Sequence, residues 1–588
     1  MNPPQTKGWR ILRRCLVGLA VCLTLLGLFY TEENWRGQRA WDNCKRALQA
    51  QGVNLDWNSY IPAPVPDDQN VFGVPEMQQW FTGRGATELW KKLSSYPGSG
   101  PTSTSDSLIV ESHAPATNAR LVVAELTIGL PGTNVPSRRG ASVFQWGDPQ
   151  AKPEVARLIK DALGPVATDP VGVDFMLRSP EEIRPAQIML QCQTAPTEKE
   201  LLQFLPTPIA NTAHPSADKT QVESNGNSSY KLTMLTPGTV AEFLKWSEQL
   251  EPELALIHMA LQRPQMRMNG DYSAPYEVPI PNFVTVRSTV QRLATMARCH
   301  LLAGKPEEAL RDLTLMHDLC RLDTNQPITL VGAMINVAVR GLFAATIADG
   351  LRWQAWRQPQ LAALEEQLKT INLLAPVKQA FEMERVSGCH ILETEPLTRI
   401  AKHLFNTSGQ AASWRNREDI VLAGLTPRGW AYQNAVTVAN LLPDTIASLN
   451  PASRIVSPDK ASAAEQKLHA VLSHSSPYTF IAVIRVPNFS KALQTTARNQ
   501  TMLDQARIAC ALERYRLAHG EYPETLDALA PQFLAAIPHD IIGGQPLHYR
   551  RAADGAFILY SVGWNGQDDG GVPGKTAADG DWVWSVPP

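Results

Sequence analysis

An uncharged and strongly apolar stretch of the chain lies near its N-terminus, at residues 15–30. Ile11 and Leu12 extend this stretch backwards, and four basic residues flank it: Lys7, Arg10, Arg13 and Arg14. A helix of about 20 apolar residues spans a bilayer, and long basic side chains at its edge can reach the headgroups. Because basic flanks stay in the cytoplasm, residues 1–31 predict a single-pass anchor in the cytoplasmic (inner) membrane, with the N-terminus cytoplasmic and the rest of the chain exported.

Other interpretations of this segment fit its residues less well. The residues before Glu32 lack the small-x-small pattern of a signal-peptide cleavage site, so we expect the helix to be retained. Val21 stands before Cys22, where a lipoprotein signal has a small residue, and Arg13 stands where a prepilin has glutamate. A buried helix of a cytosolic protein is the remaining alternative, and the basic cluster argues against it.

Residues 32–100 predict a juxtamembrane helix and a proline-rich linker. The helix covers about residues 34–60 and stops at Ile61-Pro62-Ala63-Pro64-Val65-Pro66, because proline cannot continue a helix. The stretches TEENWRGQRAW and PVPDDQN resemble the opening of a family of uncharacterised membrane-anchored bacterial proteins. That resemblance implies an anchor and carries no activity.

Short apolar runs between prolines, glycines and asparagines predict strands at residues 121–128, 188–190 and 230–235. Between them Val155, Leu158, Ile159, Ala162 and Leu163 recur at helical spacing. Residues 101–236 are therefore expected to form a small α+β domain.

Helical periodicity dominates residues 237–487, with a first helix at 242–262 and a long array from Val284. Residues 293–310 resemble one tetratricopeptide hairpin, with Gly304 at its turn. A single copy favours a general α-helical domain over a solenoid. The apolar run 330–351 is predicted to be a buried core helix, because Arg340 and Asn336 would be costly in lipid.

Residues 488–588 predict a long helix to His519, ended by Gly520, and then strands around Tyr549 and Phe557–Ser561. The order Tyr515, Gly520, Tyr522-Pro523, Gly544-x-Pro546-Leu547-x-Tyr549, Tyr560-Ser561 and a Gly/Asp loop closing on Trp582 resembles the globular part of type II secretion major pseudopilins. The resemblance covers about one sixth of the chain. It implies a helix packed on a small antiparallel sheet, followed by an acidic calcium-binding loop.

Carried over by position, the calcium ligands that this resemblance implies are Ser561, Asp568, Asp569 and Asp579. Calcium takes six to eight hard oxygen ligands, and glycines in the loop let the backbone fold tightly around them. Trp564-Asn565 departs from the family's shorter turn. A solvated Asp/Gly turn is the equal alternative. Because some 450 residues separate the anchor from this module, polymerisation in the manner of a pilin is not expected.

Charge and cysteine usage add little chemistry. The 588 residues include 54 basic and 56 acidic ones, so the chain has no overall positive potential to attract phosphate groups. No nucleic-acid partner is therefore expected. Six of the eight cysteines lie outside the anchor, far apart and without a C-x-x-C pair. Small buried hydrophobes are favoured for them, with disulfides left open.

No zincin, nucleophile-elbow, P-loop or dinucleotide motif is present. Glu382, Glu384, Glu393 and Glu395 gather acids on one predicted helix, where a solvated face is favoured over acid–base chemistry. We therefore expect a mainly α protein with α+β parts that serves as a non-enzymatic envelope scaffold with protein partners. A periplasmic enzyme with a pocket near Glu382, Glu384 or His390, and a component of a type II secretion-like system, are the alternatives.

Overall fold

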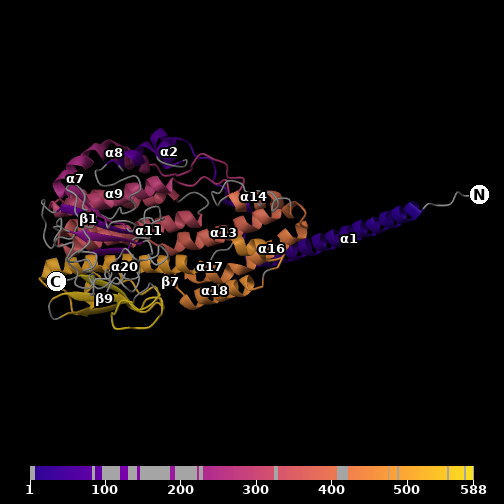
Figure 1. Ribbon diagram of the computed structural model, residues 1–588. Coiled ribbons are helices and arrows are strands. Elements are labelled where there is room, and N and C mark those ends of the chain that lie inside the picture. Colours follow the sequence, from indigo (N-terminus) through magenta and orange to yellow (C-terminus); the bar gives the residue numbers. More distant parts are fainter. Residues whose placement is uncertain are drawn as a thin grey trace, which may run out of the picture.

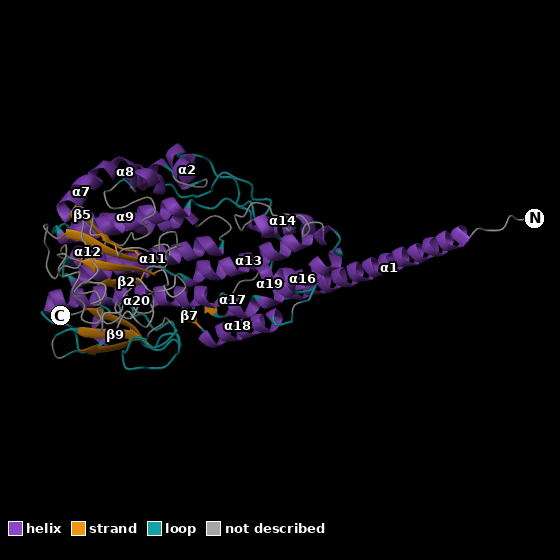
Figure 2. Ribbon diagram, viewed as in Figure 1, coloured by secondary structure: helices purple, strands orange, loops and turns teal. Residues whose placement is uncertain are grey.

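The structure is a computed structural model in which one long helix projects from an elongated body (Figure 1). It describes residues 7–82, 87–93, 95, 120–129, 142–145, 186–192, 221–223, 229–323, 329–406, 422–474, 476–485, 489–552, 555–574 and 578–586. Within these ranges the chain is mainly helical, with small sheets, as Figure 2 shows. The mainly α fold class with an apolar N-terminal helix is thereby confirmed in that coarse form.

The projecting helix α1 (Lys7–Ala50) runs without a break from the basic flank, through the apolar stretch, into the body. It ends earlier than the helix predicted for residues 34–60. Gly52 takes a left-handed conformation (φ 78°), and the N–H of Val53 donates to the carbonyl of Leu48. This is a common way to end a helix at glycine. Residues 57–60 then form a separate 3-10 turn, capped by Asp56.

The other helices make up most of the body. They are α2 (Pro75–Phe81), α3 (Glu88–Leu93), α7 (Val240–Ser247), α8 (Glu251–Leu261), α9 (Phe283–Leu302), α10 (Pro306–Leu319), α11 (Leu330–Arg352), α12 (Gln358–Lys369), α13 (Leu374–Thr394), α14 (Leu397–Asn406), α16 (Arg428–Leu441), α17 (Pro443–Ala447), α18 (Pro458–Leu472), α19 (Phe480–Arg485) and α20 (Ser490–His519). Short 3-10 turns are η1 (Trp57–Tyr60), η2 (Val71–Gly73), η7 (Glu248–Leu250), η8 (Cys320–Asp323) and η9 (Leu526–Leu529). The helix predicted at 242–262 is thus split into α7, η7 and α8.

Helices α9 and α10 form the hairpin that the residue pattern predicts, with Gly304 at its turn (φ 71°). Helix α11 packs against α9, α13 and α20, and most of its length is buried. Its central Arg340 donates to Nδ1 of His317 at 2.7 Å, and Asn336 donates to the carbonyl of Cys320 at 3.0 Å. The prediction of a buried core helix at residues 330–351 is confirmed, because its polar groups have protein partners.

Five strands form one sheet in the order β2-β3-β1-β5-β4. They are β1 (Arg120–Gly129), β2 (Ser142–Gln145), β3 (Ala186–Cys192), β4 (Gln221–Glu223) and β5 (Ser229–Thr239). The pairs are antiparallel except β2 with β3, and β1 lies at the centre, with Ala124 opposite Leu190 on one side and Met234 on the other. The three predicted strands are therefore confirmed. The helix expected around Val155–Leu163 lies outside the described residues.

Helix α20 crosses the body beside α11 and α12, and the C-terminal sheet packs beside it (Figure 1). Arg507 of α20 pairs with Glu365 of α12 at 2.7 Å, with Glu365 buried and Arg507 partly buried. Gly520 ends the helix in a left-handed conformation (φ 87°), as predicted. The sheet is an antiparallel meander of β8 (His548–Arg551), β9 (Phe557–Ser561) and β10 (Trp582–Val586). A two-stranded ribbon, β6 (Leu449–Asn450) with β7 (Ile455–Val456), lies before α18.

One continuous hydrophobic core joins α1, the helical array, α20 and the C-terminal sheet. The predicted limit between residues 487 and 488 therefore falls within shared packing, and the domain limits remain predictions. The long helix and antiparallel sheet expected at residues 488–588 are present as elements. Their likeness to a pseudopilin stays a resemblance of sequence.

Candidate functional site

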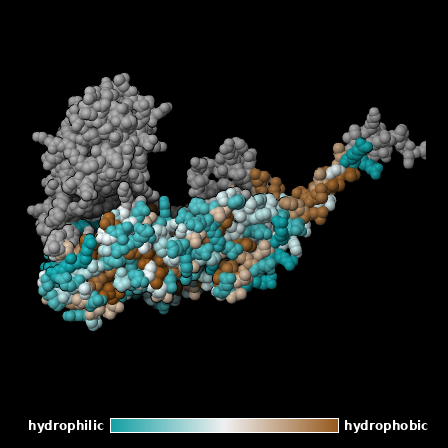
Figure 3. All heavy atoms as spheres, turned by 90° about the horizontal axis from the view of Figure 1, so that it is seen from below, coloured by the Kyte–Doolittle hydropathy of each residue, from teal (hydrophilic) through white to brown (hydrophobic). Residues whose placement is uncertain are grey.

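The N-terminal part of α1 stands free of the body. Large side chains from Leu12 to Phe29 are 45–61% exposed, and Figure 3 shows apolar atoms covering the helix up to the body. Among the described residues, α1 and α11 are the two helices long and apolar enough to cross a membrane. The apolar window of α1 has no buried residues, whereas 56% of the window in α11 is buried. Of the two, only α1 offers an apolar surface that lacks a protein partner.

Immediately after this free part, α1 meets α16 at two glycines. A Cβ added to Gly37 would lie 2.6 Å from the carbonyl carbon of Gly429, and a Cβ on Gly429 would lie 2.9 Å from the Cα of Asn34. Both distances are closer than real Cβ atoms come to other atoms. Small residues are what let two helix backbones approach so closely. The junction therefore excludes every residue except glycine at these two positions.

The carboxylate of Glu33 is buried at the same junction, with 6% exposure. The indole N–H of Trp430 donates to it at 2.8 Å, and the hydroxyl of Tyr478 at 3.1 Å. Arg36 completes the group with an ion pair of 2.9 Å to Glu33. A buried carboxylate is tolerated when donors and an opposite charge surround it. Glu33 therefore holds α1, α16 and the turn before α19 together.

Two further contacts fix the helix at the point where it leaves the body. The side chain of Asn34 accepts the N–H of Gly429 at 2.8 Å, and the hydroxyl of Tyr30 donates to the carbonyl of Leu425. The rings of Phe29 and Trp430 meet edge to face, with centroids 6.4 Å apart. The last apolar residues of α1 are thus already in contact with the body. We call Glu33, Gly37, Gly429, Trp430 and Tyr478 the anchor junction.

Most acidic residues predicted to cluster on one helix face have structural partners. Glu393 pairs with Lys45 of α1 at 2.6 Å, and Glu395 accepts the hydroxyl of Tyr276 at 3.0 Å. Glu384 accepts the N–H of Leu330 at 3.4 Å. Burial, with a smaller contribution from the charge of Glu382, raises the pKa of Tyr60.

The neighbouring His390 is half-buried, which lowers its pKa, and its ring lies 6.1 Å from that of Trp57. The ion pair between Glu393 and Lys45 adds a second link between α1 and the body.

In the C-terminal loop, Ser561 is completely buried and faces inward. Its hydroxyl donates to Asp540 at 2.9 Å and accepts the N–H of Gly563 at 3.2 Å. Asp540 also accepts the N–H groups of Ile542 and Val562, at 2.9 and 3.0 Å. Burial raises the pKa of Asp540, and these three donors oppose that shift. Ser561 and Asp540 therefore tie the loop to the turn before β8.

The predicted ligands Asp568, Asp569 and Asp579 are exposed. Asp568 accepts the N–H of Gly570 at 2.9 Å, which lowers its pKa, and the hydroxyl of Tyr560 at 3.1 Å. Asp569 accepts the amide of Asn565 at 3.0 Å. The buried Asp581, which was not among the predicted ligands, accepts the N–H groups of Asp569 and Gly571.

Within the part of the chain that the structure describes, no group of three or more His, Cys, Asp or Glu side chains is placed to hold a metal. Asp568 and Asp569 accept hydrogen bonds from donors of this loop and of β9. Calcium binding stays a prediction.

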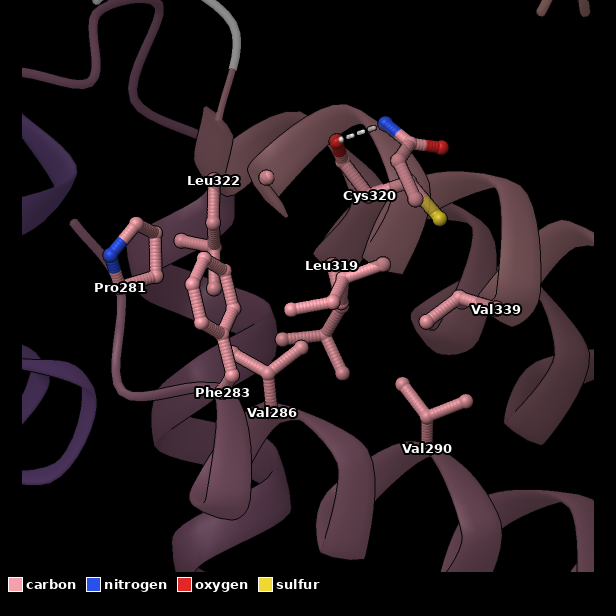
Figure 4. A pocket seen from close by; sticks show the side chains of 11 residues that line it. Pro281, Phe283, Val286, Val290, Leu319, Cys320, Leu322 and Val339 are labelled. Atoms are coloured by element: carbon pink, nitrogen blue, oxygen red, sulfur yellow. Dashed lines mark hydrogen bonds between the residues drawn. The ribbon is translucent and has the colours of Figure 1, made fainter. Parts of the chain in front are cut away.

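A pocket of ≈ 330 Å³, counted out to open solvent, lies between α9, α11 and η8 (Figure 4). Its walls are apolar, from Phe283, Val286, Val290, Leu319 and Val339 among others. A binding site for a small molecule combines an apolar lining with a few converging polar groups. Asn336, the polar side chain in this lining, donates to the carbonyl of Cys320, and the titratable group among the lining residues is the buried thiol of Cys320.

Seven of the described cysteines are free, and four of these are buried: Cys299, Cys320, Cys389 and Cys510. Burial raises the pKa of three of these thiols, in Cys299, Cys320 and Cys510. A thiol held protonated in an apolar core is unreactive. These four residues behave as small hydrophobes, the interpretation that the sequence favours.

No protein-family model, curated protein or solved structure matches this chain. The interpretation of the site therefore depends on the residues of this chain alone.

The sequence did not single out the anchor junction. One signal was available, because Glu33 lies three residues after the apolar run ends at Tyr30, and Gly37 comes one helical turn later on the same face. The partner glycine, Gly429, is about 400 residues away in sequence, and no local pattern connects the two.

Proposed function

We propose that this protein is a membrane-anchored envelope scaffold whose α1 crosses the cytoplasmic membrane once, with the N-terminus in the cytoplasm and the helical body outside. The single observation that carries the proposal is the bare apolar surface of α1 from Leu12 to Phe29, which leads directly into the anchor junction. A signal sequence that is removed needs no packing against the mature protein. In this chain, the residues that follow the apolar run form a buried, hydrogen-bonded contact with the body.

The non-enzymatic part of the proposal is supported by the groups that the structure describes. The candidate acids Glu384, Glu393 and Glu395 each bind a structural partner, and the buried thiols are held protonated. The apolar pocket between α9 and α11 has no titratable group in its lining apart from a buried thiol. An unrecognised periplasmic enzyme remains the alternative proposal.

A role beside a type II secretion-like system is the second alternative, and the C-terminal sequence resemblance supports it. The long helix α20 packs against α11 and α12, so this module exposes its sheet and loop to a partner more than its helix. Binding of a partner protein through the β8–β10 meander is therefore favoured over assembly through α20.

Affinity purification of the full-length chain from its native membranes, followed by mass spectrometry, tests the scaffold role. Envelope or secretion proteins recovered in constant proportion support it, with an equally abundant single-pass membrane protein as the matched bait. Recovery of the chain alone contradicts the scaffold role and favours the enzyme.

A further inference from the structure

The short turn before α16 carries two leucines that face solvent. Leu422 and Leu425 are 61% and 63% exposed, whereas Ala423 between them packs against the core. The N–H of Leu425 donates to the carbonyl of Leu422, so the two side chains leave one helical turn in similar directions. Contact with water does not account for two exposed leucines here. They lie beside the place where α1 leaves the body.

A contact with α1 fixes the level of this turn along the axis of the proposed anchor. Tyr30 is the last apolar residue of the run at residues 15–30, and its hydroxyl donates to the carbonyl of Leu425. The backbone of Leu425 therefore lies at the level where the apolar surface of α1 ends. Aromatic side chains such as those of Phe29 and Tyr30 favour this level of a bilayer, at the border between hydrocarbon and headgroups.

A third exposed apolar side chain lies near the same level. Phe480, at the start of α19, is 52% exposed and follows Tyr478, which donates to Glu33. Because a helix rises 1.5 Å per residue, Glu33 lies only about 4.5 Å beyond Tyr30 along α1. Trp35 is also exposed, and Arg39 lies over its ring at 5.3 Å, a pairing suited to the headgroup region.

We propose that Leu422, Leu425 and Phe480, which we call the basal patch, insert into the interface of the same bilayer that α1 crosses. The inference rests on the proposed anchoring role of α1 and adds a second contact between the body and the lipid. A helix that crosses the membrane can tilt and rotate. Because the anchor junction is packed and hydrogen-bonded, lipid contact by the basal patch fixes the orientation of the whole body over the membrane.

The test uses the full-length chain in lipid nanodiscs, with the photo-crosslinking residue p-benzoylphenylalanine placed at one position at a time. The positions are Leu25 in the free part of α1, Leu425 in the basal patch, and Leu517, which is 48% exposed near the far end of α20. Lipid adducts are identified by mass spectrometry after illumination. All three positions are exposed, so substitution leaves the core unchanged.

Lipid adducts at Leu25 and Leu425 and none at Leu517 are the expected result. Adducts at Leu25 without adducts at Leu425 overturn the basal patch and leave the anchor in place. Absence of adducts at Leu25 overturns the anchoring role itself. Adducts at Leu517 equal to those at Leu425 show non-specific lipid contact, which also overturns the proposal.

Discussion

Gly37 of α1 and Gly429 of α16 lie in backbone contact, at the point where a helix with an apolar surface enters the body. A Cβ on either residue would overlap main-chain atoms of the other helix. Main-chain atoms cannot rotate away as a side chain can, so this contact is either kept or lost as a whole. The direction of α1 relative to the body is therefore set by packing and not by a flexible linker.

Gly37→Ala should separate the two helices. Forcing a methyl group into a packed contact typically costs about 1–3 kcal/mol. Gly27→Ala in the same helix is the matched control, because nothing lies within 4 Å of a Cβ there. Thermal unfolding of the detergent-solubilised chain should show a lower midpoint for Gly37→Ala and no loss for Gly27→Ala. Equal midpoints for the two variants would refute the close crossing.

Glu33→Gln should weaken the anchor junction, because the ion pair with Arg36 is lost and the two donors then meet a neutral oxygen. Hydrogen bonds to charged groups contribute about 1.5–3 kcal/mol, so a loss of this order is expected in the free energy of unfolding. Glu32→Gln is the control at the adjacent, exposed position. Hydrogen exchange at residues 428–434 should quicken in the Glu33 variant only. Unchanged exchange there would mean that Glu33 does not hold α16.

His317 should make the body sensitive to acid. Burial, and then the charge of Arg340, lowers the pKa of His317 from 6.5 to about 3. The unfolded chain therefore binds a proton below pH 6.5 that the folded chain does not take up until about pH 3. The free energy of unfolding that the neutral imidazole contributes is present above pH 6.5 and is lost as the pH falls. By linkage the loss is about 2 kcal/mol between pH 7 and pH 5.

His317→Gln keeps an acceptor for Arg340 and removes the proton site. The decrease in thermal midpoint between pH 7 and pH 5 should be smaller for this variant than for the wild type. His258→Gln, at an exposed position of α8, should leave the decrease unchanged. A His317 variant as acid-sensitive as the wild type would show that the imidazole is not shielded as described.

Calcium should be tested on the intact chain, because α20 shares its core with α11 and α12. If the C-terminal loop binds calcium, millimolar calcium raises the thermal midpoint, and Asp568→Ala combined with Asp569→Ala abolishes the rise. The exposed Asp68→Ala serves as the control acid. The hydrogen bonds that Asp568 and Asp569 already make favour the solvated-turn interpretation. A calcium-induced rise that survives the double substitution would remove these two aspartates as ligands.

Local patterns in the sequence were sufficient for much of the fold. The strands at residues 121–128, 188–190 and 230–235 follow from short apolar runs bounded by proline, glycine or asparagine, and the end of α20 at Gly520 follows from glycine's access to positive φ. The burial of α11 follows from one argument, namely that Arg340 is costly in lipid and needs a protein partner. His317 is that partner.

Contacts between distant segments could not be predicted from the sequence. The glycine contact joins residues 37 and 429, and Glu33 meets Trp430 and Tyr478. Each of these residues has an ordinary local interpretation, and only packing gives them a common role. The acids between residues 382 and 395 show the same limit, because the sequence favoured a solvated face for them whereas Lys45 and Tyr276 bind Glu393 and Glu395.

The intact mass of the protein taken from its native membrane fraction tests the central claim most directly. If α1 is a retained anchor held by the junction, the membrane-bound chain carries residues 1–31 and its mass matches the 64.7 kDa of the whole sequence. A mature chain found in the soluble envelope fraction and beginning after residue 31 would contradict the account, because α1 would then be a cleaved signal sequence.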